Sequence, residues 1–186
     1  MNENHFELEF FEDDHGRQPC RAFLLSLESP KRQALEQALL GFLAREGNNV
    51  CGTEWGKALG GGLSEFRVRH TEDEVMRLVR PDLVEALSER GNAIPPSEAK
   101  VLLRVFFHAY GDKVILLIGG YDKGRDPSAR RQEREIRHAR QLLRQFHQQQ
   151  RPTGSNMGPR GVRAGDSFRT YWAGRRPDWR QRWKGR

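Results

Sequence analysis

A strand-like stretch with an arginine and a histidine on one face, followed by a basic loop, holds the side chains of this chain best suited to chemistry. In residues 101–110, Arg104 and His108 fall on the same face, because alternate residues of a strand point to the same side. The next apolar stretch runs out into a glycine-rich segment that contains Lys123 and Arg125. Guanidinium and ammonium groups stabilise anions, and a histidine exchanges protons near neutral pH. The pattern therefore favours a cationic face with one candidate acid or base.

A β-hairpin must position these side chains. Residues 101–110 are rich in β-branched and aromatic types, and Gly111 and Asp112 separate them from a second apolar run at 114–118. Two such runs joined by a short Gly-containing turn are typical of paired antiparallel strands.

A helix is predicted after the hairpin, over residues 128–147. Asp126 has the type preferred at an N-cap, and Pro127 has the type preferred at the first helical position. The arginines between Arg130 and Arg144 are expected to form a solvated face. The apolar stripe that packs this helix on the sheet consists of Ile136, Ala139, Leu143 and Phe146.

The earlier part of the chain predicts two further strands and a helical hairpin. Residues 6–10 alternate apolar and acidic types, which is typical of a half-buried strand. Helices are predicted from Pro19 to Leu27 and from Ser29 to Glu46, where Gly47 ends the second one. A strand over residues 63–70 has one face made of Glu65, Arg67 and Arg69.

These elements predict an α+β domain of the order β-α-α-β-β-β-α. Its sheet should be small, twisted and mainly antiparallel, with the helical hairpin and the helix at 128–147 packed on its apolar face. The domain spans residues 1–150 and contains an insertion at about residues 71–100. Part of this insertion, residues 75–87, is expected to be helical.

The positive charge of the chain is concentrated at its C-terminal end. Residues 151–186 hold 10 Lys and Arg against 2 Asp and Glu, so this segment accounts for the net charge of +7 of the whole chain. Its Gly, Pro and Arg content, with few aliphatic residues, predicts a disordered, basic tail rich in Trp and Arg. Such a tail suits affinity for RNA or the ribosome. The alternative is a merely solubilising extension.

The two cysteines and the lack of long apolar runs bear on location. Cys20 and Cys51 have no metal-ligand spacing and are too few for a disulfide framework, so a reducing compartment is expected. No apolar run approaches the roughly 18 residues of a membrane span, and no signal peptide is recognisable at the N-terminus. We expect a soluble, cytoplasmic protein with no membrane partner.

Four short motifs in order resemble the RelE/ParE superfamily of bacterial toxins, and above all its phage-derived, HigB-like branch. Residues 63–68 read Leu-Ser-Glu-Phe-Arg-Val, and residues 103–107 read Leu-Arg-Val-Phe-Phe. Gly-Tyr-Asp-Lys follows at 120–123, and Pro127 precedes the Glu-Ile-Arg-His-Ala sequence at 135–139. The resemblance covers residues 5–147 and implies a RelE-like fold.

The resemblance implies the toxin component of a type II toxin–antitoxin system. Its expected activity is that of an mRNA interferase, an endoribonuclease that cleaves mRNA on the ribosome and inhibits translation. Its expected partners are a cognate antitoxin protein and mRNA, with DNA contacted only through the antitoxin complex. No cofactor or metal is implied, because attack of a ribose 2′-OH on the adjacent phosphate needs only stabilisation of negative charge. The alternatives are a ParE-like gyrase inhibitor and a catalytically silent binding module.

The resemblance also implies roles for individual residues. Arg67, Arg104 and Lys123 match the family's cationic positions. His108 is the candidate acid or base from its place on the strand face, and the alternative is an ordinary solvated histidine. Gly124 stands where the family usually has a second lysine, which favours the silent module. If Arg67 and Arg104 are instead only exposed strand cations, Glu65 is their expected partner. The residues expected to bind RNA are Arg69, His70 and Arg125.

Overall fold

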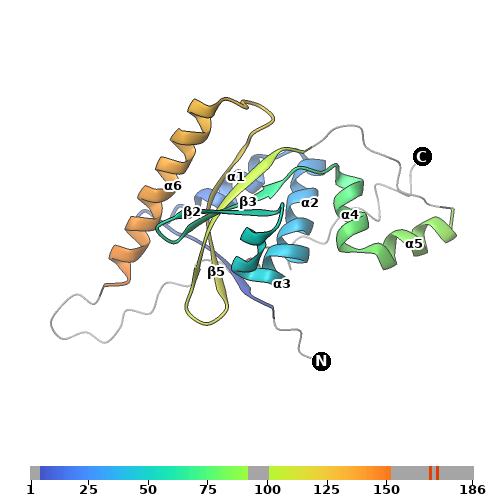
Figure 1. Cartoon of the computed structure of the whole chain (residues 1–186), viewed down its shortest axis with the longest axis horizontal. Helices are drawn as coiled ribbons and strands as arrows, with labels where there is room; N and C mark the ends of the chain where they lie inside the picture. The colour runs from blue at the N-terminus through green and yellow to red at the C-terminus, as the bar shows by residue number, and fades with distance from the viewer. Residues whose placement is uncertain (1–4, 92–100, 152–167, 169–170, 172–186) are drawn as a thin grey trace.

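The computed structural model describes residues 5–91, 101–151, 168 and 171. Its centre is a five-stranded mixed sheet in the order β1-β5-β4-β3-β2 (Figure 1). The strands are β1 (Glu7–Phe10), β2 (Gly56–Gly60), β3 (Leu63–Val68), β4 (Leu103–Tyr110) and β5 (Val114–Asp122). β1 pairs in parallel with β5, and the other pairings are antiparallel. The α+β class and the predominance of antiparallel pairing are confirmed.

The hairpin predicted from the two apolar runs is β4 and β5. Gly111 and Lys113 both have a positive φ in the turn between them, a conformation that glycine adopts without steric cost. Sequence analysis missed β2, which forms the sheet edge beside β3. Its sequence, Gly-Lys-Ala-Leu-Gly, has neither β-branched residues nor alternation, so its pairing with β3 supplies what its own propensity lacks.

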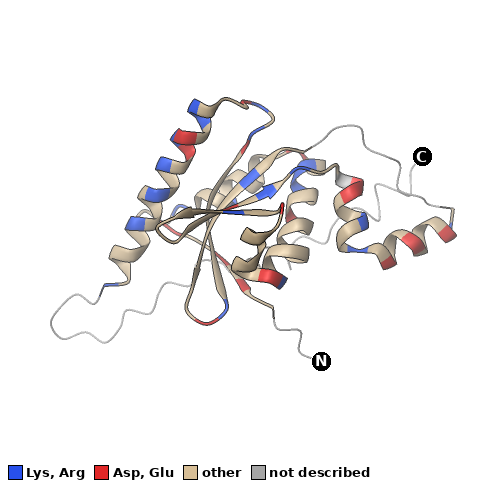
Figure 2. Ribbon diagram, viewed as in Figure 1, with Lys and Arg blue, Asp and Glu red and all other residues tan. Residues whose placement is uncertain are grey.

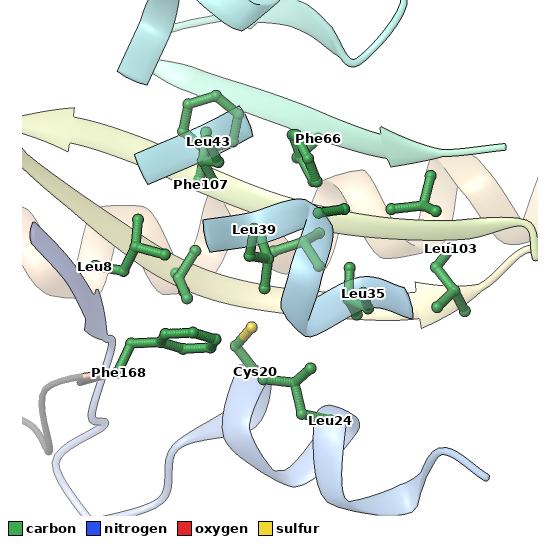
Figure 3. Packing of buried hydrophobic residues seen from close by; sticks show 14 of the residues in the cluster. Leu8, Cys20, Leu24, Leu35, Leu39, Leu43, Phe66, Leu103, Phe107 and Phe168 are labelled. Carbon is green, nitrogen blue, oxygen red and sulfur yellow. The ribbon is translucent and has the colours of Figure 1, made fainter. Parts of the chain in front are cut away.

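One face of the sheet is covered by the helical hairpin. Helix α1 (Pro19–Ser26) and helix α2 (Ser29–Ala38) are followed by a π-helical turn, η1 (Leu39–Leu43), by α3 (Ala44–Glu46) and by a 3₁₀ turn, η2 (Gly47–Gly52). Gly47 has φ +56°, which ends the helical run where the sequence predicted. Figure 3 shows how leucines of α2 and η1 pack on the sheet residues Phe66, Leu103 and Phe107.

The opposite face is covered by α6 (Ala129–Gln149) (Figure 1). The expectation that all helices pack on one face is therefore wrong. Both faces are apolar, because a second buried cluster joins α6 to the alternate strand residues. The sheet contributes Leu63, Phe106, Leu116, Ile118 and Tyr121 to this cluster.

The beginning of α6 also differs from the prediction. The N-cap is Ser128, whose hydroxyl accepts a hydrogen bond from the Arg131 backbone N–H at 3.2 Å. The Asp126 carboxylate instead accepts from the Ser128 N–H at 3.1 Å, in the turn before the helix. Asp126 and Pro127 thus lead into the helix rather than start it.

The insertion forms two helices, α4 (Glu72–Val79) and α5 (Pro81–Glu89). A capping box starts α4, because the Thr71 hydroxyl and the Glu74 carboxylate each accept a hydrogen bond from the other residue's backbone N–H. The helical content expected at 75–87 is confirmed, and the rest of the insertion, 92–100, lies outside the described residues. Of the helices that are described, none combines the length and the apolar composition that crossing a membrane requires.

Two residues of the expected disordered tail lie in the core. Phe168 and Tyr171 are 1% and 5% exposed, and both rings contact Phe10 of β1. Figure 3 shows Phe168 near Cys20 of α1. The Tyr171 hydroxyl also donates a hydrogen bond to the buried Glu36 carboxylate at 2.8 Å. At these two positions the prediction of disorder is wrong, and the rest of residues 152–186 lies outside the described part of the chain.

Candidate functional site

The predicted cationic residues of β3 and β4 are direct cross-strand neighbours. Arg67 is the register partner of Arg104, and Arg104 is the register partner of Tyr121 on β5. Side chains of register partners point to the same face of a sheet. These three residues, which we call the cross-strand row, therefore lie side by side on the face that α6 covers.

A β-bulge decides which residues of β5 share this face. The pairing shifts by one residue between Phe106 and Phe107, so Ile118 is the extra residue on β5. Without this shift, Arg104 would pair with Gly120, and Tyr121 would point to the opposite face. The bulge thus brings Tyr121 beside Arg104, and alternation from Tyr121 places Lys123 on the same side.

Gly120 is required next to the bulge. A Cβ at this position would lie 2.4 Å from the ring of Phe23 on α1 and 2.8 Å from the backbone oxygen of Arg104. Only glycine allows β4, β5 and α1 to approach so closely.

Glu65 is the carboxylate that organises the cross-strand row. It is fully buried on the same face of β3, two residues before Arg67. Its Oε2 accepts a hydrogen bond from Arg67 Nε at 2.8 Å and lies 3.9 Å from Arg104 Nε. One buried carboxylate therefore compensates two guanidinium groups, and the trio keeps a net positive charge.

The two arginines differ in what they can reach. Arg104 is 3% exposed, and its Nη1 donates to the backbone oxygen of Leu103 at 2.9 Å. The Arg67 side chain is 17% exposed, and its Nε is held by Glu65. Within the described residues, the two Nη groups of Arg67 have no hydrogen-bond partner, so they can bind an anion in bidentate fashion. Direct contact of Arg104 with a substrate, as the sequence predicted, does not fit its burial.

Several buried polar atoms around the row have no hydrogen-bond partner within the described residues. They are Glu65 Oε1, Arg104 Nε and the Tyr121 hydroxyl oxygen. Burial lowers the pKa of Arg104, while the nearby Glu65 carboxylate opposes this effect. Burial, together with the Glu65 charge, raises the pKa of Tyr121 to about 12. Because buried polar groups are normally paired, this concentration marks a functional-site candidate.

The first turns of α6 lie close to the row. The charges of Arg131 and Glu135 act on Tyr121, and Arg131 Nε lies 2.6 Å from Glu135 Oε1. Lys123 joins the same region, because its ammonium group donates to Gln132 Oε1 at 3.0 Å. The row is thus bordered by the end of β5 and the beginning of α6.

Arg69 and Arg125 lie at the edge of this region. Arg69 is exposed just beyond β3, and its positive charge contributes to lowering the pKa of Arg104. Arg125 is exposed and lies 3.7 Å from the Asp122 carboxylate, which also pairs with Lys31 at 2.7 Å. Arg69 can therefore add charge to the site, whereas the charge of Arg125 is partly compensated.

The two predicted histidines are not part of the row. His108 is four residues from Arg104, about 13 Å along the strand, where its Nδ1 lies 2.7 Å from the backbone oxygen of Gly62. Its ring also contacts the ring of His147 near the end of α6. His70 is stacked on Trp55, with nitrogens 3.7 Å from Glu54 and 3.6 Å from Glu74. The negative charges of these two glutamates disfavour binding of RNA phosphates at His70.

Sequence analysis considered Glu65 only as a surface partner of the arginines and did not assign a role to Tyr121. Glu65 carried a recognisable signal, because it stands two residues from Arg67 on the same strand face. Tyr121 could not be placed, since the bulge that turns it toward Arg104 has no marker in the alternation of residues. The described part of the chain contains no grouping of three His, Cys, Asp or Glu side chains suited to hold a metal ion.

Comparison with known proteins adds no relative: no family model, curated protein or solved structure matches the chain.

Proposed function

We propose that this chain is the toxin of a type II toxin–antitoxin system, with a RelE-like fold, and that it cleaves mRNA on the ribosome. The observation that carries the proposal is the cross-strand row, in which the two predicted arginines are register partners on adjacent strands. The order and spacing of the four motifs that resemble the superfamily support it. The proposed place of action is the cytoplasm.

Arg67 is the proposed phosphate ligand. Glu65 holds its Nε, and within the described residues the Nη groups make no hydrogen bond and can bind a phosphate. Lys123 and Arg69 supply further positive charge at the edge of the row. Arg104 acts as a positioning residue, because it is buried and reaches the reacting groups only through Glu65.

The proposed reaction is a transesterification. The 2′-oxygen of a ribose bonds to the adjacent phosphorus, the bond from phosphorus to the 5′-oxygen breaks, and a 2′,3′-cyclic phosphate and a 5′-hydroxyl result. Water takes the proton from the 2′-OH and supplies one to the departing 5′-oxygen. The protein stabilises the negative charge of the pentacoordinate phosphorus with preorganised cations, a contribution on the order of a hundredfold for each charge.

The proposed partner in the resting cell is a cognate antitoxin with an acidic segment. Such a segment would cover Arg67, Arg69 and Lys123 and exclude mRNA by charge complementarity. A silent binding module is the second candidate, and the Glu65 pairing favours it, because part of the cationic charge is compensated within the fold. A ParE-like gyrase inhibitor is the third.

Inducible expression in a host without the antitoxin tests the proposal. The wild-type chain should stop growth and amino-acid incorporation, and Arg67→Gln should abolish both effects. Arg45→Gln is the matched control, because Arg45 is an exposed arginine on α3, on the other side of the sheet. A harmless wild-type chain would support the silent module, and growth arrest with normal translation but altered plasmid supercoiling would support gyrase inhibition.

A further inference from the structure

Helix α6 carries a ridge of exposed arginines on the side opposite its buried face. The exposed members are Arg130, Arg134, Arg137, Arg140 and Arg144, which we call the arginine ridge. At about 100° per residue, they fall within an arc of about 120°. The arc is centred opposite the apolar stripe that includes Ala139 and Leu143. Figure 2 shows basic residues on successive turns of α6.

The ridge is poorly compensated by acidic residues. Arg140 donates to the backbone oxygen of Leu59 at 2.8 Å, and within the described residues the other four make no ion pair. Glu133 is the single acidic residue on this face of α6. The ridge therefore presents five positive charges along about 21 Å of helix. The negative charges near it are Glu133 and, in the turn before the helix, Asp126, whose pKa is lowered in part by the charge of Arg134.

The arrangement does not serve the stability of the helix. The first turn of α6 has no acidic residue, although the helix dipole favours negative charge there, and the last turn has only His147 as a basic residue. Arginines three and four residues apart also repel one another along the ridge. Arg140 gains a hydrogen bond to β2 in return, but within the described residues the other four arginines gain no hydrogen bond or ion pair. Their cost to the isolated helix points to a polyanionic partner.

We infer that the arginine ridge binds the phosphate backbone of double-stranded RNA. The only Phe, Tyr or Trp of α6 is Phe146, which is buried, so the ridge offers no platform for stacking the bases of a single strand. It also lacks the apolar centre that a protein partner would use: the large hydrophobic side chains exposed in the described residues are Leu25 and Leu78, neither of them on α6. A rigid, straight line of guanidinium groups matches the regular phosphates of a duplex.

The choice of RNA as the ligand rests on the proposed function. The inference adds that the arginine ridge would hold structured RNA beside the cross-strand row. The ridge starts at the first turns of α6, which border the cross-strand row. A paired RNA segment on the ridge would thus place an adjoining single strand near Arg67. Binding can be measured without cleavage, so the two proposals can fail separately.

The test measures the affinity of the full chain for a 2′-O-methyl RNA duplex, which has no 2′-OH to attack, over a range of salt concentrations. The ridge variant is R134Q/R137Q/R144Q. The matched control is R45Q/R77Q/R90Q, which removes the same charge from exposed arginines of other elements. The ridge variant should reduce the slope of log K against log salt by about 2 to 3, and the affinity about tenfold or more. The control should change the slope by less than about one.

Three outcomes would overturn the inference. Equal losses in the two variants would mean that net charge alone determines binding. Equal affinity of the wild type for the unpaired strand would exclude duplex recognition, and equal affinity for a DNA duplex would exclude the assignment to RNA. Thermal unfolding of the ridge variant controls for folding, and its midpoint should equal or exceed that of the wild type, because repulsion along α6 is removed.

Discussion

Removing Glu65 should destabilise the fold mainly through Arg104. In Glu65→Leu, the guanidinium of Arg104 would stay 3% exposed without its carboxylate. Loss of one partner of a buried ion pair costs about 3–5 kcal/mol, a large fraction of a typical stability of about 5–15 kcal/mol. Arg104→Met should cost a similar amount, because it leaves Glu65 buried beside Arg67 alone. The double variant E65L/R104M should recover most of the loss, since apolar residues of similar volume replace a buried pair at little cost.

Urea unfolding of the wild type, both single variants and the double variant measures the coupling. We expect a coupling energy of at least about 2 kcal/mol. E65L/R67M is the matched control and should show little rescue, because the Arg67 side chain is 17% exposed and can turn to solvent. The view that Glu65 compensates the buried Arg104 is refuted if the losses of unfolding free energy in Glu65→Leu and Arg104→Met simply add in the double variant. It is also refuted if E65L/R67M recovers as much unfolding free energy as E65L/R104M.

Two further predictions concern the core and the pH dependence of stability. Phe168→Ala should lower the free energy of unfolding by about 3–5 kcal/mol, because Phe168 and Tyr171 are buried against Phe10. Truncation after residue 151 should lower the melting temperature for the same reason. An unchanged melting curve would contradict this. The raised pKa of Tyr121, about 12 in the fold against an ordinary value of about 10, means that its contribution to stability is present below about pH 10 and is lost toward pH 12. Urea titrations at pH 8, 10 and 11 should show a shallower alkaline decline of stability for Tyr121→Phe than for the wild type. An identical decline would contradict the burial of the Tyr121 hydroxyl.

The alternation of residues predicted the faces of β3 and β4 but not their surroundings. Arg67 and Arg104 were correctly assigned to strands, because polar and apolar residues alternate there. Their pairing depends on strand register, and the side chains that cover them depend on α6. The burial of Arg104 follows from α6 packing on this face, which no local pattern indicated. The same burial changes what its variants can report, since Arg104→Ala should now impair folding as well as activity.

The tail shows what amino-acid composition alone cannot predict. Gly, Pro and Arg dominate residues 151–186, a composition that predicts a segment without a core of its own. Phe168 and Tyr171 lie three residues apart, a spacing that places two rings on one side of a helical turn. That spacing is a usable signal for docking on another element, which the interpretation of the aromatic residues as platforms for bases leaves out.

Arg67 is proposed to stabilise 2′-OH attack on a phosphate of mRNA. The most direct measurement follows cleavage of a reporter mRNA in a translation reaction, with a single 2′-O-methyl group at the nucleotide whose 2′-OH would attack. The proposal predicts that the wild-type chain cleaves the unmodified mRNA to a 2′,3′-cyclic phosphate end, that the methyl group blocks this cut, and that Arg67→Gln slows it on the order of a hundredfold. Cleavage at the methylated nucleotide, or equal rates for Arg67→Gln and the wild type, would contradict it.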